Sequence, residues 1–163
     1  MNEWDRKMAE MQRDQEQARK AENERRSSEV ELGRWFAHKA RGVPLQSCAV
    51  SVTWRVAGKG PYGGHETRSV SKPIAAWIVI LLPPTETFHA IHKGSYIFVT
   101  PEGQSANCNQ HGDSNRDLSL SGTIPEMPEK MLQSALSDGV SLYHSNELMK
   151  WLLDHGIEPS GSL

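Results

Sequence analysis

A long charged stretch without proline begins the chain and limits what the chain can fold into. Residues 1–41 hold half of all the Asp, Glu, Lys and Arg residues in a quarter of the length, and their only glycine is Gly33. Acidic residues precede basic ones by four positions at three places, a spacing that stabilises a helix by about 0.2–0.5 kcal/mol per pair. We therefore predict a charged helical arm over residues 1–41. The three pairs are Glu3/Lys7, Glu16/Lys20 and Glu22/Arg26.

A seam of positions spaced alternately four and three residues apart runs along this predicted helix. Its two ends are apolar, but charged residues occupy positions 22, 25 and 29 in its middle. A stable two-stranded coiled coil needs apolar residues at most seam positions. The pattern leaves three alternatives open: a helix that lies on its own domain or in solvent, self-association, and docking in a groove of a protein partner. The seam positions are Trp4, Met8, Met11, Gln15, Ala18, Glu22, Arg25, Glu29, Leu32 and Phe36.

Ser28 and Glu31 support another interpretation, in which the arm consists of two helices. They have the spacing of a capping box, which can begin a separate helix over residues 29–40. This second helix would bring Trp35 and Phe36 to the core of the domain, while the seam at the start of the arm stays free. The predicted partner-binding residues are Trp4, Met8, Met11, Trp35 and Phe36.

Alternation of apolar and polar residues predicts β-structure after Pro44. The apolar residues at every second position from 48 to 56 should share one buried face of a strand. A glycine-rich turn over residues 58–64 and a second strand over residues 67–71 would complete a hairpin. The members of the buried face are Cys48, Val50, Val52, Trp54 and Val56.

Two further segments have the composition of strands. Residues 74–82 are apolar, rich in β-branched side chains and bounded by prolines, which predicts a fully buried central strand. Residues 88–91 and 95–100 flank a short turn that contains glycine, which predicts a second hairpin. Together these segments predict a mostly antiparallel sheet of four to five strands.

The last third of the chain combines a polar segment with two short helices. Residues 101–123 are rich in Gly, Asn, Ser and Asp, and we expect a long loop there. Pro128 suits the first turn of a helix that ends at Ser137. Ser145 can cap a last helix that ends at His155.

The predicted fold class is α+β. A long charged N-terminal helix is followed by a mostly antiparallel four- to five-stranded sheet with two short C-terminal helices. Residues 1–41 are predicted to form the helical arm, for oligomerisation or partner docking, and residues 43–163 to form one compact α+β domain.

Charge and composition narrow the classes of function. The net charge of −2 provides no basic excess, which argues against nucleic acid as a partner. The longest apolar run, residues 74–82, is half or less of the roughly 20 residues that a membrane-spanning helix requires. Two cysteines without a CxxC pair indicate a reducing compartment. We expect a cytoplasmic protein with no membrane partner.

Four histidines could in principle supply metal ligands, because neutral imidazole and carboxylate are groups that zinc or iron accepts. His89 and His92 are three residues apart, a spacing that places them on opposite faces of a strand. The others come from distant loops, so we expect neither a metal nor any other cofactor. The candidate ligands are His65, His89, His92 and His111, followed by Asp113.

Cys108 is the candidate for nucleophilic catalysis. His111 follows it by three residues and could act as the base, while Asp113 or Asp117 could orient the histidine. A nucleophilic cysteine needs a lowered pKa, and cysteines in loops are mostly inert. Cys48 lies on the predicted apolar face of its strand and is expected to be a core residue.

A weak platform for single-stranded nucleic acid is a further alternative. Arg55, Lys59 and Arg68 would lie near Tyr62 and Trp54, which combines cations with rings on which bases can stack. A solvated face of the sheet explains the same residues more simply.

These features favour a non-catalytic interaction protein. Such a chain would be a small regulator, inhibitor or accessory subunit, of the kind that phages and other mobile elements carry. It would act by binding a protein partner or itself, as a homo-oligomer. The alternatives are a small metal-dependent or cysteine-dependent hydrolase and a weak binder of single-stranded nucleic acid. The interaction protein is preferred because it needs only features that the sequence contains.

Overall fold

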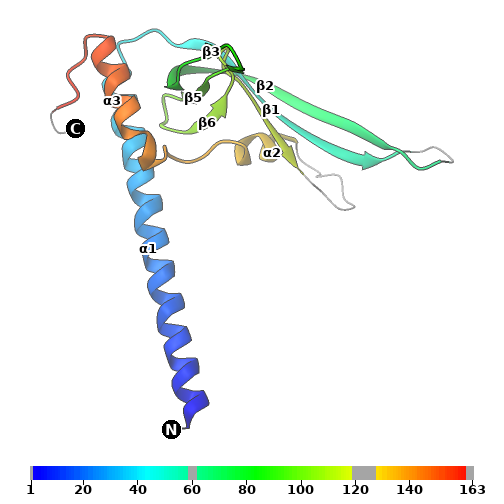
Figure 1. Cartoon of the computed structure of the whole chain (residues 1–163), viewed down its shortest axis with the longest axis vertical. Helices are drawn as coiled ribbons and strands as arrows, with labels where there is room; N and C mark the ends of the chain where they lie inside the picture. The colour runs from blue at the N-terminus through cyan, green and yellow to red at the C-terminus, as the bar shows by residue number, and fades with distance from the viewer. Residues whose placement is uncertain (1, 59–61, 119–127, 161–163) are drawn as a thin grey trace.

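A computed structural model describes residues 2–58, 62–118 and 128–160, and it confirms the α+β class (Figure 1). A long N-terminal helix precedes a five-stranded, mostly antiparallel sheet and short C-terminal helices. None of the described helices combines the length and the apolar character needed to cross a membrane. The elements are α1 (Glu3–Ala40), β1 (Gln46–Ala57), β2 (His65–Leu82), β3 (Thr85–Thr87), β4 (Ala90–His92), β5 (Ser95–Val99), β6 (Ser105–Cys108), β7 (Asp113–Leu118), α2 (Pro128–Ser134), the 3-10 helix η1 (Leu142–His144) and α3 (Ser145–Asp154).

The predicted long N-terminal helix is present, and it is one continuous helix and not two. α1 begins with a capping box, in which the N–H of Asp5 donates to Asn2 Oδ1 at 2.8 Å. Ser28 does not start a second helix, contrary to that interpretation. Extending an existing helix adds one hydrogen bond per residue, whereas a new helix needs a costly nucleus, so the chain continues the first one. The ion pair between Arg25 and Glu29 crosses this point.

The strands lie in the order β6-β5-β2-β1-β7, and only the β1–β7 pair is parallel. A tight turn joins β6 to β7, in which the N–H of Asn109 donates to the carbonyl of Asp113 at 3.0 Å. The two edge strands therefore contact each other, and the sheet curls on itself. β1 and β2 continue as a long hairpin that extends away from α1 and α3 (Figure 1). Its predicted glycine-rich tip includes residues 59–61, which lie outside the described part of the chain.

Side chains from the two faces of the sheet form two cores. The inner face carries the alternating residues of β1 from Cys48 to Trp54, which are buried together with side chains of α2. This burial confirms the predicted alternation. The outer face of β2 and β5 packs against α3 and the last third of α1. The members of this outer core are Phe36, Ala37, Ala40, Trp77, Val79, Ile97, Val99, Val140, Leu148 and Leu152.

β2 joins the strands predicted at residues 67–71 and 74–82 into a single strand that passes through Pro73. The N–H of Ala49, which lies opposite Pro73, donates to the carbonyl of Gly112 at 3.3 Å and so faces β7. The backbone of Pro73 therefore faces the other side of β2, where β5 has not yet begun to pair. The missing N–H of proline removes no ladder hydrogen bond there, which is why the strand continues.

The end of β2 departs from the prediction of a fully buried strand. Ile80 and Leu82 are 53% and 65% exposed, whereas Ala76, Trp77 and Val79 are buried. β1 begins opposite Ala76, so among the described strands none continues beside the end of β2 on that side. The prediction was wrong at this end because composition does not reveal where the neighbouring strand starts. An apolar strand end is left on the surface.

Three other segments also differ from the predictions. Residues 88–91 do not pair with residues 95–100; β3 and β4 form a small hairpin, and β5 pairs with β2. The predicted loop over residues 101–123 contains β6 and β7, whose polar sequences hide the strand pattern. The hydroxyl of Ser145 donates to the carbonyl of Leu142 at 2.5 Å and does not cap α3.

Candidate functional site

The N-terminal part of α1 extends away from the domain (Figure 1). The helix joins the domain at Glu29, whose carbonyl accepts a backbone hydrogen bond of 3.0 Å from the segment before η1. Of the predicted arm, residues 3–28 lie before this junction, and we restrict the name arm to them. Near its far end Trp4, Met8 and Met11 are 73%, 54% and 55% exposed. Three of the predicted partner-binding residues therefore form an open apolar stripe on one face of the arm.

Trp35 and Phe36, the other two predicted partner-binding residues, lie in the domain. Phe36 is fully buried, and its ring centroid lies 6.0 Å from that of Trp77 and 5.1 Å from that of Trp151. Trp35 is half-buried and packs against the same core. These two residues anchor α1 to the sheet, so the open apolar surface of the helix is confined to the arm.

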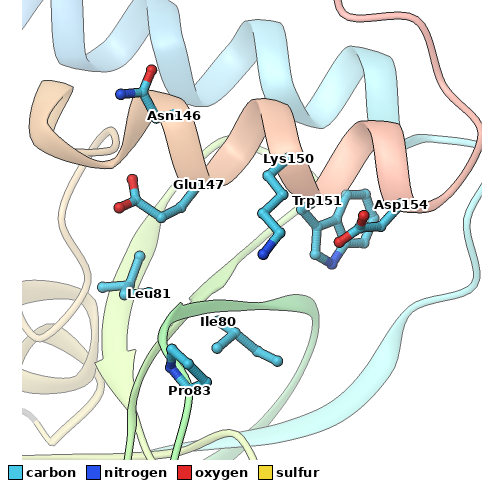
Figure 2. A pocket seen from close by; sticks show the side chains of 8 residues that line it. All are labelled: Ile80, Leu81, Pro83, Asn146, Glu147, Lys150, Trp151 and Asp154. Carbon is cyan, nitrogen blue, oxygen red and sulfur yellow. The ribbon is translucent and has the colours of Figure 1, made fainter.

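A groove separates α3 from the end of β2 (Figure 2). Residues of α3 line one side of it, and Lys150 extends from there toward Ile80 and Pro83 on the opposite side. Its volume is about 380 Å³, which falls in the range of roughly 300–1,000 Å³ that is usual for ligand pockets. We call it the α3–β2 groove. It is lined by Ile80, Leu81, Pro83, Asn146, Glu147, Lys150, Trp151 and Asp154.

The α3–β2 groove combines apolar side chains with an acidic wall. The indole N–H of Trp151 donates to the carbonyl of Ile78 at 3.0 Å, which fixes the position of the ring. Oε2 of Glu147 is buried and has no hydrogen-bond partner among the residues that the structure describes. Asp154 adds a second carboxylate, against one ammonium from Lys150. Two carboxylates against one ammonium give the lining a negative balance, so the groove favours a ligand that brings a cation flanked by apolar groups.

The surface continues past Pro83 into a second hollow of about 450 Å³. The β3–β4 hairpin beside it carries Phe88 and Ile91, both strongly exposed. The sequence did not predict either hollow, because residues 74–82 have the composition of a buried strand. One sequence signal could have indicated the first hollow. Between Glu147 and Asp154, polar residues recur beside Trp151 on one face of the predicted last helix. The second hollow is lined by Leu82, Pro83, Thr85, His92, Lys93, Gly94 and Ser95.

The candidate metal ligands whose side chains the structure describes do not converge. Among the described residues, no group of three or more His, Cys, Asp or Glu side chains is close enough to hold a metal ion. His89 packs edge-on against Phe88, and His92 lines the second hollow. His111 lies in the turn between β6 and β7. The side chain of His65 lies outside the described residues.

Cys108, the candidate nucleophile, is held as a thiol. Burial, followed by the effects of Cys48 and of the Asp113 carboxylate, raises the pKa of Cys108 to about 12. A nucleophilic cysteine requires a lowered pKa. The ring of His111 lies 3.1 Å from the side-chain amide of Gln110. Asp113, proposed to orient the base, therefore acts against formation of the thiolate.

Alkylation of Cys108 should be slow at neutral pH. With a pKa of about 12, a fraction on the order of 10⁻⁴ is thiolate at pH 8, against a substantial fraction for a free cysteine. Its rate should rise about tenfold per pH unit from pH 7 to 10, because only the thiolate reacts. Iodoacetamide labelling read by peptide mass spectrometry measures this rate, and urea-unfolded protein is the control. Labelling of folded and unfolded chains at equal rates would restore Cys108 as a candidate nucleophile.

The residues considered for binding single-stranded nucleic acid are dispersed. Arg68 lies opposite Trp54 and Arg55 opposite Thr67 in the β1–β2 register, so the two arginines point to opposite faces of the sheet. Trp54 is buried and offers no stacking surface, whereas Tyr62 is exposed. Lys59 lies outside the described residues. The described members of this set form no common platform.

Comparisons with protein-family models, with curated proteins and with solved structures found no match to this chain. Function is therefore inferred from the surfaces of the molecule itself.

Proposed function

We propose that this chain is a non-catalytic interaction protein that self-associates through the arm. The observation that carries the proposal is the stripe of Trp4, Met8 and Met11 near the far end of a helix that projects from its domain. Large apolar side chains grouped on an otherwise charged surface mark a protein interface. Tryptophan and methionine are also enriched where proteins meet.

The stripe is not needed to keep the arm helical. Charged residues do that, as in the cluster where Arg25 and Arg26 both pair with Glu22, at 2.5 Å and 3.1 Å. Hydrogen bonding to Arg25 is the main cause that lowers the pKa of Glu22. Trp4, Met8 and Met11 are therefore not required for the arm to be helical. A role in binding explains why large apolar side chains occupy these exposed positions.

The seam that is open for binding is short. Leu32 and Phe36 belong to the outer core or pack against it, so they do not extend the seam toward a partner. A coiled coil along all of α1 would require this core to open. The open seam runs from Trp4 to Ala18, about two heptads, and a two-stranded coiled coil of that length is marginal. A seam of this length favours binding through a few apolar side chains that insert into a partner surface over binding through a long coiled coil.

The hydrolase is the weaker alternative for this chain. The raised pKa of Cys108 opposes nucleophilic chemistry. The described candidate histidines lie in separate places, two in or beside the β3–β4 hairpin and one in the β6–β7 turn. Small regulators, inhibitors and accessory subunits work through surfaces such as the arm, and one of these roles is the function that we propose.

Replacing Trp4, Met8 and Met11 together with alanine should weaken self-association roughly a hundredfold or more. Interface anchors of this kind contribute 1–2 kcal/mol or more each, and tenfold in affinity corresponds to about 1.4 kcal/mol. Alanine has the highest helix propensity, so the arm stays helical. Light scattering over a dilution series measures the effect.

The matched control replaces three residues on the opposite side of the same helix. Arg6, Arg13 and Gln17 lie there at 100° per residue, and all are exposed. Their triple alanine variant should keep the self-association of the intact chain within severalfold. Equal weakening by both triple variants would show that the stripe has no special role and would contradict the proposal.

A further inference from the structure

We propose that the stripe on the arm of one copy binds in the α3–β2 groove of a second copy. This inference rests on the proposed function and names the surface that receives the arm. The two features are the exposed apolar face of the arm and the groove between α3 and the end of β2, both formed by described residues.

The arm does not reach the groove of its own chain. Trp4 precedes Glu29, where α1 joins the domain, by 25 residues, which is about 37 Å of helix at 1.5 Å per residue. α3 packs against the C-terminal part of α1, so the groove lies at the end of the molecule opposite the arm tip (Figure 1). A continuous helix does not fold back over that length. The receiving groove therefore belongs to another molecule.

The apolar parts of the two surfaces suit each other. The arm tip presents Trp4, Lys7, Met8 and Met11 at positions i, i+3, i+4 and i+7, the spacing with which helices enter grooves. Methionine is flexible and adapts to irregular apolar surfaces. The groove offers an apolar side formed by the end of β2, Pro83 and the ring of Trp151.

The charges are complementary as well. Lys7 Nζ lies 5.4 Å from the Trp4 ring centroid, within the stripe, and 3.6 Å from Glu3 Oε1. Both side chains of that ion pair are exposed, so exchanging the partner of Lys7 costs little. The groove supplies two carboxylates, Glu147 and Asp154, against the one ammonium of Lys150. Lys7 placed in the groove would lie beside these carboxylates, and the opposite charges would attract each other.

Reciprocal binding gives a closed assembly. Each copy contributes one arm and one groove, so two copies can exchange arms around a two-fold axis and form two identical contacts. The contacts act together, since the first holds the second arm near its groove. This arrangement predicts a dimer in which both surfaces are covered.

The test is complementation between two full-length variants that each lack one of the two surfaces. The arm variant carries Trp4→Ala, Met8→Ala and Met11→Ala; the groove variant carries Ile80→Glu. Self-association should weaken roughly a hundredfold or more for the arm variant, which loses three anchors, and about thirtyfold or more for the groove variant. An equal mixture should form a one-to-one complex of twice 18.2 kDa, because one intact arm meets one intact groove. Analytical ultracentrifugation detects this complex.

The control for the groove variant is Leu153→Glu. Leu153 is 56% exposed, close to the 53% of Ile80, and it lies outside the groove lining. This variant should self-associate like the intact chain. Circular dichroism of all variants verifies that each is folded.

Charge reversal provides a second test that does not depend on apolar residues. Lys7→Glu and Glu147→Lys should each weaken self-association about tenfold, as expected when like charges meet at an interface. The two substitutions combined in one chain should recover most of that loss. A double variant that is no better than either single variant would overturn the pairing of these residues.

The outcomes separate this inference from the proposed function. If the arm variant is monomeric, Ile80→Glu associates like the intact chain, and the mixture forms no complex, then arms bind one another. That result overturns the groove and leaves the proposed function in place. If the intact chain is itself monomeric, both proposals fail. Complementation by the mixture, with each variant defective alone, supports both.

Discussion

Replacing Phe36 with alanine is expected to lower the free energy of unfolding by about 3–5 kcal/mol. The Phe36 ring is fully buried between Trp77 and Trp151, where it joins α1, the sheet and α3. Its removal leaves a cavity at the point where three elements meet. Because domains of this size are stable by only about 5–15 kcal/mol, the variant should lose a large share of its free energy of unfolding. Urea denaturation followed by circular dichroism measures the change.

Trp4→Ala is the control for this prediction. It removes an aromatic ring from the same helix, but from an exposed position, and should change stability by less than about 0.5 kcal/mol in a dilute sample. The pair of variants separates anchoring of α1 from binding by the arm. A loss below about 1 kcal/mol for Phe36→Ala would contradict the described packing of α1 on the sheet.

Replacing Gly33 with alanine is expected to destabilise the protein by about 1–3 kcal/mol. In an exposed helix the same change would stabilise by roughly 0.5–1 kcal/mol, since glycine is a poor helix former. Here an added Cβ would collide with the backbone carbonyl of Gly103. Gly103 has a φ of 83°, so its own replacement by a larger residue would also be strained. Close approach of α1 to this loop explains why the only glycine of the helix stands where it does.

Gly42→Ala tests whether this effect is local. A Cβ added at Gly42 meets no described atom within 4 Å, so this variant should be neutral within about 0.5 kcal/mol. Thermal unfolding compares the two variants under the same conditions. Stabilisation by Gly33→Ala would show that the helix and the loop do not approach each other as described.

Local patterns predicted the elements that depend on local forces. Spaced charges and the absence of proline indicated a helical arm, and alternation from Cys48 to Val56 indicated β1. These signals sufficed because helix pairs lie within one turn and a strand shows its buried face at every second residue. The choice between one helix and two needed the structure, since Ser28 and Glu31 are compatible with both.

Elements that depend on distant contacts were missed. β7 has the sequence DSNRDL, with hardly any apolar alternation, and it forms only because β1 provides a parallel neighbour. Pro73 suggested a break in β2, but its backbone faces a side without a neighbouring strand. Whether β7 forms and whether β2 continues through Pro73 both depend on how distant segments pair. A short stretch of sequence does not contain that pairing register.

Of the two surfaces in the proposed contact, the stripe on the arm could be predicted from the sequence and the groove could not. Trp4, Met8 and Met11 were predicted from the seam alone, because an exposed helix shows its apolar stripe directly. The α3–β2 groove was not, because Ile80 and Leu82 end an apolar run that looks buried from composition. Their exposure depends on where β1 begins, which is a tertiary property.

The most direct test of the account is the mass of the intact chain in solution, measured by light scattering over a wide range of concentrations. We expect the mass to rise with concentration from 18.2 kDa toward twice that value. For the variant that lacks Trp4, Met8 and Met11, the rise should begin only at concentrations about a hundredfold higher or more. An intact chain that stays at 18.2 kDa at every concentration would contradict self-association through the arm.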